Sequence, residues 1–331
     1  MLMAATLLVI LVASELFTNA LEHLGEKLGI SEGVTGSLFA AVGTALPETM
    51  IPLLALVGGT VNIEVNEEIG VGAILGAPLM LSTLSTALMA LAVVRLRGLL
   101  GRMTPERSGQ VRDLNFFLFA FALAGLAMVV PVDARALRRA LSLVLVLIYS
   151  AYIWRTLQAS NRLVEQGHGT AAVKQLFFAR LGLPTTWTMI WLQIGLGLLL
   201  LVAGAKGFIQ GVESAAPILG VSALLLSLIV IPIATELPEK VNSILWIRRR
   251  KDTLAFGNIT GAMVFQGTLL PAIGIMLTPW QPRIEVLMGV LVTLLAAGWL
   301  RVSAGARGFP VWALLLNGVL YAGYLVVTLR V

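Results

Sequence analysis

The stretches that decide the fold are Gly43–Glu48, which reads GTALPE, and Ala234–Glu239, which reads ATELPE. Each lies inside a long apolar segment and places a glutamate, Glu48 or Glu239, directly after a proline. A charged group at mid-bilayer costs about 3 kcal/mol on insertion scales, so it needs a reason to be there. Proline removes a backbone N–H and clashes with the preceding turn, which predicts a broken or bent helix at both positions. Because irregular backbone within a membrane must be buried in protein or line a wet cavity, the two stretches predict a cation site of hard oxygen ligands.

The composition places the chain in a membrane. Of its 331 residues, 58% are hydrophobic and 12% are charged, and the mean hydropathy is +0.93. Soluble proteins carry about 25% charged residues. The net charge is +6, but the basic residues stand between apolar runs rather than in one stripe, so we expect the lipid bilayer as a partner and no nucleic acid. The chain has no cysteine, which excludes disulfides and thiolate metal sites.

We predict ten membrane spans, because each needs about 20 mostly apolar residues. Their ranges are 2–20, 33–57, 69–94, 115–130, 137–154, 187–207, 218–247, 254–277, 284–300 and 311–329. The second is expected to break at Pro47 and the seventh at Pro238. The predicted organisation is a five-helix unit at 1–154, a cytoplasmic connecting segment at 155–186 and a second five-helix unit at 187–331.

The two halves repeat each other. A shift of 191 positions superposes 28–48 on 219–239, and a shift of 185 superposes 72–77 on 257–262. An odd number of spans per half requires the halves to cross the membrane in opposite directions, which is the inverted-repeat plan of secondary transporters. The extra residues of the first half fall in the predicted loop between the second and third spans, which carries Glu64, Glu67 and Glu68. This loop either concentrates cations or is an ordinary solvated turn.

The basic residues predict the orientation. With the N-terminus outside, 16 of the 23 Lys and Arg residues fall in loops on one side of the membrane and 6 on the other, and Lys240 lies within a span. The positive-inside rule places the richer side in the cytoplasm and both termini outside. We therefore expect a multi-pass protein of the cell (inner or plasma) membrane.

The paired glutamates predict competition between cations. Two neighbouring carboxylates repel each other unless a cation lies between them, so one site can hold a divalent ion, monovalent ions or protons. The simpler reading is that each glutamate pairs with a nearby base or stays protonated. Thr44 and Thr235 precede the glutamates by about one helical turn, where their hydroxyls either bind the ion or bond their own backbone.

Glu236 and Lys240 occur only in the second half. They are four residues apart, so they share a helix face, and we expect a pair that reduces the negative charge of the site. The alternative is that Glu236 is itself a ligand and Lys240 extends toward the membrane interface.

In these residues the chain resembles the calcium/cation antiporter superfamily, especially compact prokaryotic sodium/calcium exchangers. The segments 28–48 and 219–239 resemble the openings of the two alpha repeats of that family, and 72–81 and 257–266 resemble the second helices, so the motifs span 28–81 and 219–266. The resemblance implies an all-α membrane protein of ten helices in two inverted repeats. In that fold the second, third, seventh and eighth spans surround the ions, and the long first and sixth helices slide to alternate access.

The resemblance also assigns ion-site residues and shows departures. The family glutamates correspond to Glu48 and Glu239, and its threonines to Thr44 and Thr235. Positions where the family has serine hold Ala45, Glu236, Ala77 and Ala262, and its Asn or Asp positions hold Leu81 and Gln266. Calcium takes six to eight oxygens, so backbone carbonyls and water must supplement the side chains. The expected metal-site residues are Glu48, Glu239, Thr44, Thr235, Glu236, Gln266, Asn258 and Ala45.

The sequence therefore predicts a secondary active cation antiporter, most simply one that exchanges sodium for calcium, with no cofactor. Proton-driven exchange is the nearest alternative. A transport-inactive scaffold or sensor is another, favoured by the missing ligands and opposed by the retained glutamates. Paired aspartates and a His-Glu-x-x-His motif are absent from the sequence, so we do not expect an enzyme. The sequence leaves the oligomeric state open.

Overall fold

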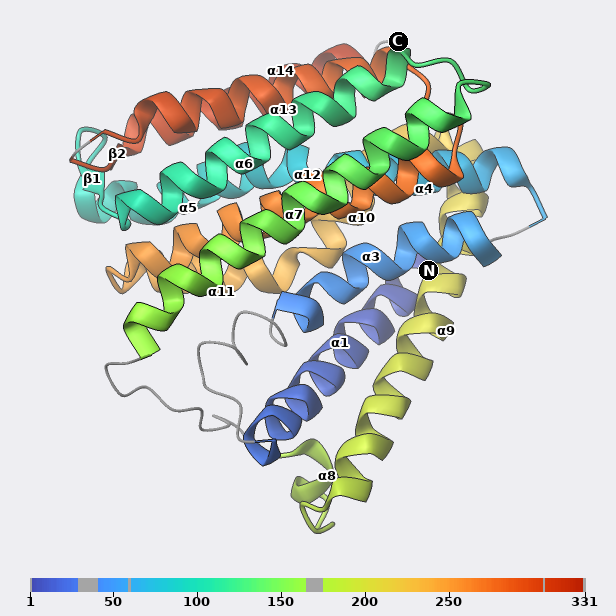
Figure 1. Cartoon of the computed structure of the whole chain (residues 1–331), viewed down its shortest axis with the longest axis vertical. Coiled ribbons are helices and arrows are strands. Elements are labelled where there is room, and N and C mark those ends of the chain that lie inside the picture. The colour runs from blue at the N-terminus through green and yellow to red at the C-terminus, as the bar shows by residue number, and fades with distance from the viewer. Residues whose placement is uncertain (1, 29–40, 59–60, 165–174, 306, 330–331) are drawn as a thin grey trace.

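The computed structural model describes residues 2–28, 41–58, 61–164, 175–305 and 307–329, and these are almost entirely helical (Figure 1). A π-helical segment, η2 (Leu81–Ser85), joins two helices, and a 3-10 segment, η3 (Ala127–Val129), ends another. The strands β1 (Arg102–Met103) and β2 (Phe309–Pro310) pair antiparallel. The helices are α1 (Leu2–Lys27), α3 (Ala41–Gly58), α4 (Ile63–Met80), α5 (Thr86–Arg97), α6 (Arg107–Leu126), α7 (Arg135–Val164), α8 (Phe177–Arg180), α9 (Trp187–Leu219), α10 (Ala223–Thr235), α11 (Leu237–Arg248), α12 (Asp252–Leu277), α13 (Ile284–Ser303) and α14 (Val311–Thr328).

The helices form two groups. The long helices α1 and α9 pack along each other and project from one side of a larger bundle (Figure 1). In that bundle α12 contacts α4, α6, α7 and α11, and α10 packs along α4. Helix α3 contacts both groups, since it packs against α1, α9, α4 and α12. The first proline-containing motif lies on α3 and the second spans the end of α10 and the start of α11, and both α3 and α10 contact α1, α4 and α9.

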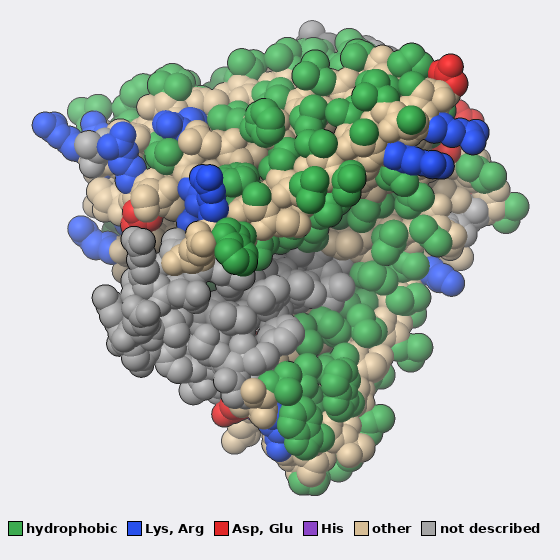
Figure 2. Space-filling view, viewed as in Figure 1, with side chains coloured by type: hydrophobic (Ala, Val, Ile, Leu, Met, Phe, Trp, Pro, Cys, Tyr) green, Lys and Arg blue, Asp and Glu red, His purple; other side chains and the backbone are tan. Residues whose placement is uncertain are grey.

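Apolar side chains cover the outside of the bundle, as expected for a protein surrounded by lipid. Figure 2 shows hydrophobic side chains spread over much of the visible face, with lysine and arginine gathered at its edges. Exposed examples are Leu143 and Leu147 on α7 and Leu199 on α9. A surface of exposed apolar side chains would favour aggregation in water, whereas in a bilayer it faces the lipid tails. The all-helical membrane class predicted from the sequence is confirmed.

Eight helical stretches of the described chain are long and apolar enough to cross a membrane. They coincide with eight of the ten predicted spans, and the predicted third span is one stretch, Ile63–Arg97, because η2 joins α4 to α5 without a break. The predicted second and seventh spans correspond to the shorter apolar helices Glu48–Gly58 and Ala223–Ile233. The motif Gly43–Glu48 ends at the first residue of one of these helices, and the motif Ala234–Glu239 directly follows the other.

The expected break is present in the second half only. There α10 ends at Thr235 and α11 begins at Leu237, with Glu236 between them at φ −89° and ψ 5°. In the first half, α3 runs from Ala41 to Gly58 through Pro47, so the break predicted at Pro47 is wrong for the described residues. Proline removes one backbone hydrogen bond, and a helix packed among others can continue across it, as α4 does at Pro78.

A close backbone contact joins α4 to α10. A Cβ atom at Gly72 would lie 2.7 Å from the backbone oxygen of Leu224, and one at Gly76 would clash with the backbone oxygen of Leu228. Only glycine permits this approach, which agrees with the packing role expected for these glycines.

The acidic residues near position 64 are not in a loop, which corrects the sequence prediction. Helix α4 already begins at Ile63, because the Asn62 side chain accepts a hydrogen bond from the Val65 N–H at 3.3 Å and so caps the helix. Glu68 forms an ion pair with Arg283 and accepts a hydrogen bond from the Leu224 N–H at 3.3 Å. Glu68 therefore ties α4 to the start of α10.

A buried ion pair holds the opposite end of the bundle. The Arg97 guanidinium donates to both carboxylate oxygens of Asp252, at 2.7 and 2.8 Å, and also to the Ile247 carbonyl at 2.6 Å. Asp252 accepts a further bond from the Thr104 N–H at 2.7 Å. This pair joins the end of α5 to the α11–α12 connection.

Replacing Arg97→Ala is expected to lower the free energy of unfolding by about 3 kcal/mol, because it leaves the buried Asp252 carboxylate without its charge partner. Thermal unfolding of the purified protein in detergent measures the change. The control is Arg95→Ala at an exposed position two residues earlier, where the expected change is below about 0.5 kcal/mol. Equal melting temperatures for the two variants would contradict the role assigned to the pair.

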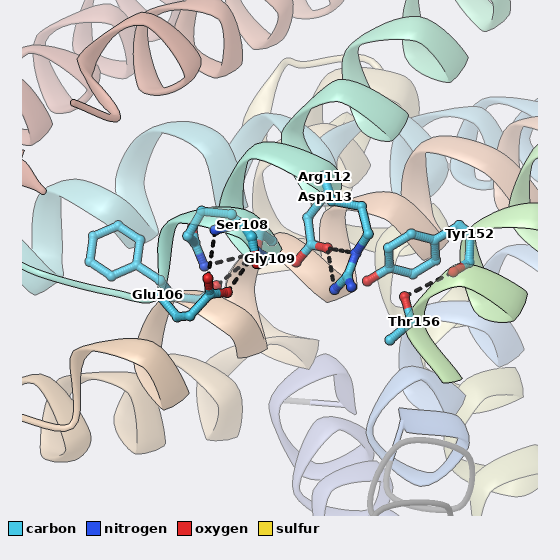
Figure 3. A network of polar contacts seen from close by, with 10 residues as sticks. Glu106, Ser108, Gly109, Arg112, Asp113, Tyr152 and Thr156 are labelled. Carbon is cyan, nitrogen blue, oxygen red and sulfur yellow. Dashed lines mark hydrogen bonds and ion pairs between the residues drawn. The ribbon is translucent and has the colours of Figure 1, made fainter. Parts of the chain in front are cut away.

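The N-terminus of α6 predicts a dependence of stability on pH. Glu106 caps this helix by accepting bonds from the Ser108 and Gly109 N–H groups, both at 2.7 Å (Figure 3). Hydrogen bonding, first from Ser108 and then from Gly109, holds the pKa of Glu106 below its usual value. A depressed pKa in the folded state means that the stabilisation is present above the unfolded-state pKa and is lost as the pH falls through the folded-state pKa.

Accordingly, Glu106→Ala is expected to destabilise the protein by about 1 kcal/mol at neutral pH, and the difference from wild type should shrink as the pH falls below about 4. Melting temperatures at a series of pH values measure this, with Arg107→Ala on the exposed neighbour as the control. A difference that grows on acidification would refute the capping role.

Candidate functional site

Three polar side chains meet at the break between α10 and α11. Glu236 is 1% exposed, and its Oε1 accepts a hydrogen bond from Gln266 Nε2 of α12 at 3.0 Å. Its Oε2 lies 3.4 Å from Lys240 Nζ. The predicted pair between these two residues is confirmed. We call Glu236, Lys240 and Gln266 the α10–α11 cluster.

The broken helix supplies a backbone oxygen to the same place. The Pro232 carbonyl accepts from the Glu236 N–H at 3.2 Å and from Lys240 Nζ at 3.0 Å. Lys240 therefore reaches back into the break and is only 8% exposed. The alternative in which Lys240 extends to the membrane interface is wrong.

Gln266 has an unused acceptor. Its side chain is buried, and its Oε1 has no hydrogen-bond partner among the residues that the structure describes. A buried oxygen without a donor is costly, and amide oxygens are ligands that hard cations accept. Gln266 therefore combines a donor that holds Glu236 with an oxygen suited to a cation.

Two further predicted ligands have other hydrogen bonds. Thr235 Oγ1 donates to the Ile231 carbonyl at 3.0 Å, which is the backbone alternative considered for this residue. Asn258 Nδ2 donates to Ser243 Oγ at 3.2 Å, between α12 and α11. Asn258 precedes Gln266 by eight residues, which is about 12 Å along a helix. The role of Asn258 as a ligand stays a prediction.

Glu48 is buried on α3 and is 4% exposed. Helix α3 contacts both α10 and α12, the helices that carry Thr235 and Gln266. The side chains of Thr44, Ala45 and Glu239 lie outside the part of the chain whose side chains are described, so their role as ligands stays a prediction. Among the described residues, no group of three or more His, Cys, Asp or Glu side chains lies together.

One face of α14 carries polar residues that the sequence analysis missed. Asn317, Tyr321 and Tyr324 stand at i, i+4 and i+7, and all three are buried. Asn317 Nδ2 donates to the Ser82 carbonyl of η2 at 2.8 Å. The spacing could have revealed this face, but the segment was read only as an apolar span.

A buried acid on α6 was also missed. Asp113 is 4% exposed and accepts from Thr260 Oγ1 of α12 at 2.8 Å and from its neighbour Arg112 at 3.1 and 3.2 Å. Figure 3 shows Tyr152 of α7 beside this pair, with its backbone carbonyl bonded by Thr156. The predicted fourth span began at residue 115, so Asp113 was placed in a loop, whereas α6 begins at Arg107.

A helical membrane bundle with a broken helix, buried acids and a buried cluster at the break has the features of a secondary transporter. The model of the family described as "Sodium/calcium exchanger protein" matches residues 1–158 and 189–330, so the chain belongs to this family. It is thus a membrane protein of a cation antiporter family and not an enzyme.

Individual relatives are distant. The chain is 26% identical over 280 residues to "Putative antiporter CaxA" of Alkalimonas amylolytica, which covers 82% of this chain and 79% of that protein. It resembles the crystal structure of the H+/Ca2+ exchanger CAX with a TM-score of 0.69 at 18% identity, over 99% of this chain and 86% of that one. It resembles the sodium-calcium exchanger NCX_Mj with a TM-score of 0.60 at 19% identity, over 100% and 99%. The two structures share the fold with this chain.

Replacing Asn317→Leu is expected to lower the free energy of unfolding by about 1–3 kcal/mol, because the Ser82 carbonyl loses a buried donor. Thermal unfolding in detergent measures this. Val319→Ala on the same helix, at a position 66% exposed, is the control, with an expected change below about 0.5 kcal/mol. If Asn317→Leu is as stable as the control, the hydrogen bond from Asn317 to Ser82 does not contribute to stability.

Proposed function

We propose that the protein is a secondary active cation antiporter that exchanges sodium for calcium by alternating access, at a midplane site that holds Glu48 and Glu239. The observation that carries the proposal is the buried α10–α11 cluster at a helix break three residues before Glu239. Glu48 is the counterpart of Glu239 in the first half and is buried on a helix that contacts α10 and α12. Membership of the exchanger family supports the same reading.

The proposal includes ten spans in two inverted units at 1–154 and 187–331, joined by 155–186. The two short apolar helices, Glu48–Gly58 and Ala223–Ile233, fall within the proposed second and seventh spans. With both termini outside the cell membrane, the side richer in lysine and arginine faces the cytoplasm.

In this scheme the site selects between calcium and sodium because the two ions compete for the same oxygen ligands. One calcium ion or several sodium ions neutralise the carboxylates, and the remaining ligands come from Gln266 Oε1, the threonine hydroxyls, Ala45 and other carbonyls, and water. Occupancy by one kind of cation excludes the other, which is the basis of exchange. Sliding of the α1–α9 pair against the bundle then exposes the site to each side in turn.

Proton-driven calcium exchange is the second candidate, and one observation favours it. Ala77 and Leu81 are buried at positions where the related family has oxygen-bearing side chains. Sodium requires several oxygen ligands in fixed positions, whereas a proton requires only a carboxylate. The loss of neutral oxygen ligands therefore weakens sodium binding more than it weakens protonation of a glutamate.

Replacing Glu48→Gln or Glu239→Gln is expected to reduce calcium-45 uptake by proteoliposomes under an imposed sodium gradient to the level of empty vesicles, since the amide carries no charge for the cation. The protein should still elute as a single species in size-exclusion chromatography. Asp133→Asn, at an exposed position between α6 and α7, is the matched control and should transport normally. Undiminished uptake in both variants would exclude these residues as the site.

The coupling ion is decided in the same vesicles. Sodium coupling predicts uptake driven by a sodium gradient at equal pH on both sides, and little uptake driven by a pH step without sodium. The reverse result would establish the proton-driven alternative. If neither gradient drives uptake and calcium does not bind, the inactive scaffold or sensor becomes the better description.

A further inference from the structure

We infer that Lys240 is a resident cation of the transport site, whose ammonium group occupies the position that a free monovalent cation would otherwise take beside Glu236. This inference rests on the proposed function, since it specifies how the same site is charged. It makes Lys240 a determinant of how many cations the site accepts.

The surroundings of the ammonium group are those of a cation site. Lys240 Nζ lies 3.0 Å from the Pro232 carbonyl oxygen and 3.4 Å from the Glu236 carboxylate. Carboxylate oxygens and carbonyls at an interrupted helix are the ligands with which discontinuous-helix transporters hold their monovalent ions. The ammonium group reaches these oxygens from within the same chain, and it is buried with them.

The cluster appears as a unit in one half only. The repeat relates Glu236, Lys240 and Gln266 to Ala45, Thr49 and Leu81. The first half therefore lacks the carboxylate, the ammonium group and the amide that fixes the carboxylate. The second half thus gains the Glu236 carboxylate, the Lys240 ammonium group and the Gln266 amide together. This is expected if Lys240 balances the charge of a carboxylate that would otherwise bind an ion.

The charge of the site follows from this pairing. With Glu236 neutralised by Lys240, the net charge of the proposed site is set by Glu48 and Glu239. Those two carboxylates match one divalent cation or two monovalent ones. Without the ammonium group, the third carboxylate would require one more cation, because an unpaired buried charge is strongly disfavoured.

The test is calcium-45 exchange against unlabelled calcium in proteoliposomes, in a medium whose only added monovalent metal or ammonium-type cation is the bulky N-methylglucamine. This exchange needs no coupling gradient, so it is independent of whether sodium or protons drive transport. Lys240→Ala is expected to lose at least tenfold in exchange rate, and added sodium, potassium or methylammonium should restore it. Wild-type exchange should need no such addition.

The matched control is the double variant Glu236→Gln with Lys240→Ala, which removes both charges. With no carboxylate of the pair left uncompensated, its exchange rate should not rise when sodium, potassium or methylammonium is added. Full exchange by Lys240→Ala without small cations would overturn the inference. So would the absence of rescue in Lys240→Ala, or equal stimulation of both variants by small cations. If Lys240→Ala does not fold, the inference requires the double variant to fold in N-methylglucamine, and a double variant that also fails to fold contradicts it.

A second measurement separates this inference from the proposed function. The melting temperature of purified Lys240→Ala should rise by several degrees on adding sodium or potassium in place of N-methylglucamine, and that of wild type should change less. If wild type shows no calcium exchange but small cations stabilise Lys240→Ala, the proposed antiporter function is wrong and the inference about Lys240 is supported. If wild type exchanges calcium and the variant gains neither stability nor activity, the inference is wrong and the function stands.

Discussion

The structure depends on how buried carboxylates are neutralised inside a bundle that faces lipid. Asp113, Glu236 and Asp252 each lie within 3.4 Å of a basic nitrogen, from Arg112, Lys240 and Arg97 respectively. The Asp252 pair closes one end of the bundle, and the Glu236 pair lies at the break in the seventh predicted span. Since an unpaired charge in this setting costs several kcal/mol, each of these three carboxylates depends on the basic group beside it.

Much of the fold could be predicted from the sequence, because hydropathy reports span length directly. The predicted eighth and ninth spans, 254–277 and 284–300, agree with α12 and α13 to within three residues. The positions of proline residues predicted helix breaks less reliably. Proline predicted the break near Glu236 correctly and the one at Pro47 wrongly, since packing around a helix decides whether a missing hydrogen bond interrupts it. The π-helical segment at Leu81–Ser85 has no signal in span hydropathy.

The candidate site could be predicted in part. The spacing of Glu236 and Lys240 predicted their pair, because residues four apart share a helix face. Gln266 was named through the family resemblance, and its bond to Glu236 places it in the α10–α11 cluster, while its role as an ion ligand stays a prediction. Asn317 and Asp113 were missed for different reasons. The first requires knowledge of which helices meet, and the second fell outside a span whose start was set eight residues too late. The meeting of Glu48 with Glu239 stays a prediction.

The glycines of α4 have a mechanical consequence. At Gly72 and Gly76 the backbone of α4 touches that of α10, which leaves no space for side chains that could reorient between the two helices. We expect such a contact to resist sliding of α4 along the axis of α10, because the backbone of each helix would then meet side chains of the other helix. We therefore expect α4 and α10, one helix from each half of the chain, to move together as one body. Relative motion within the protein is then expected at other helix contacts, with this pair as the fixed reference.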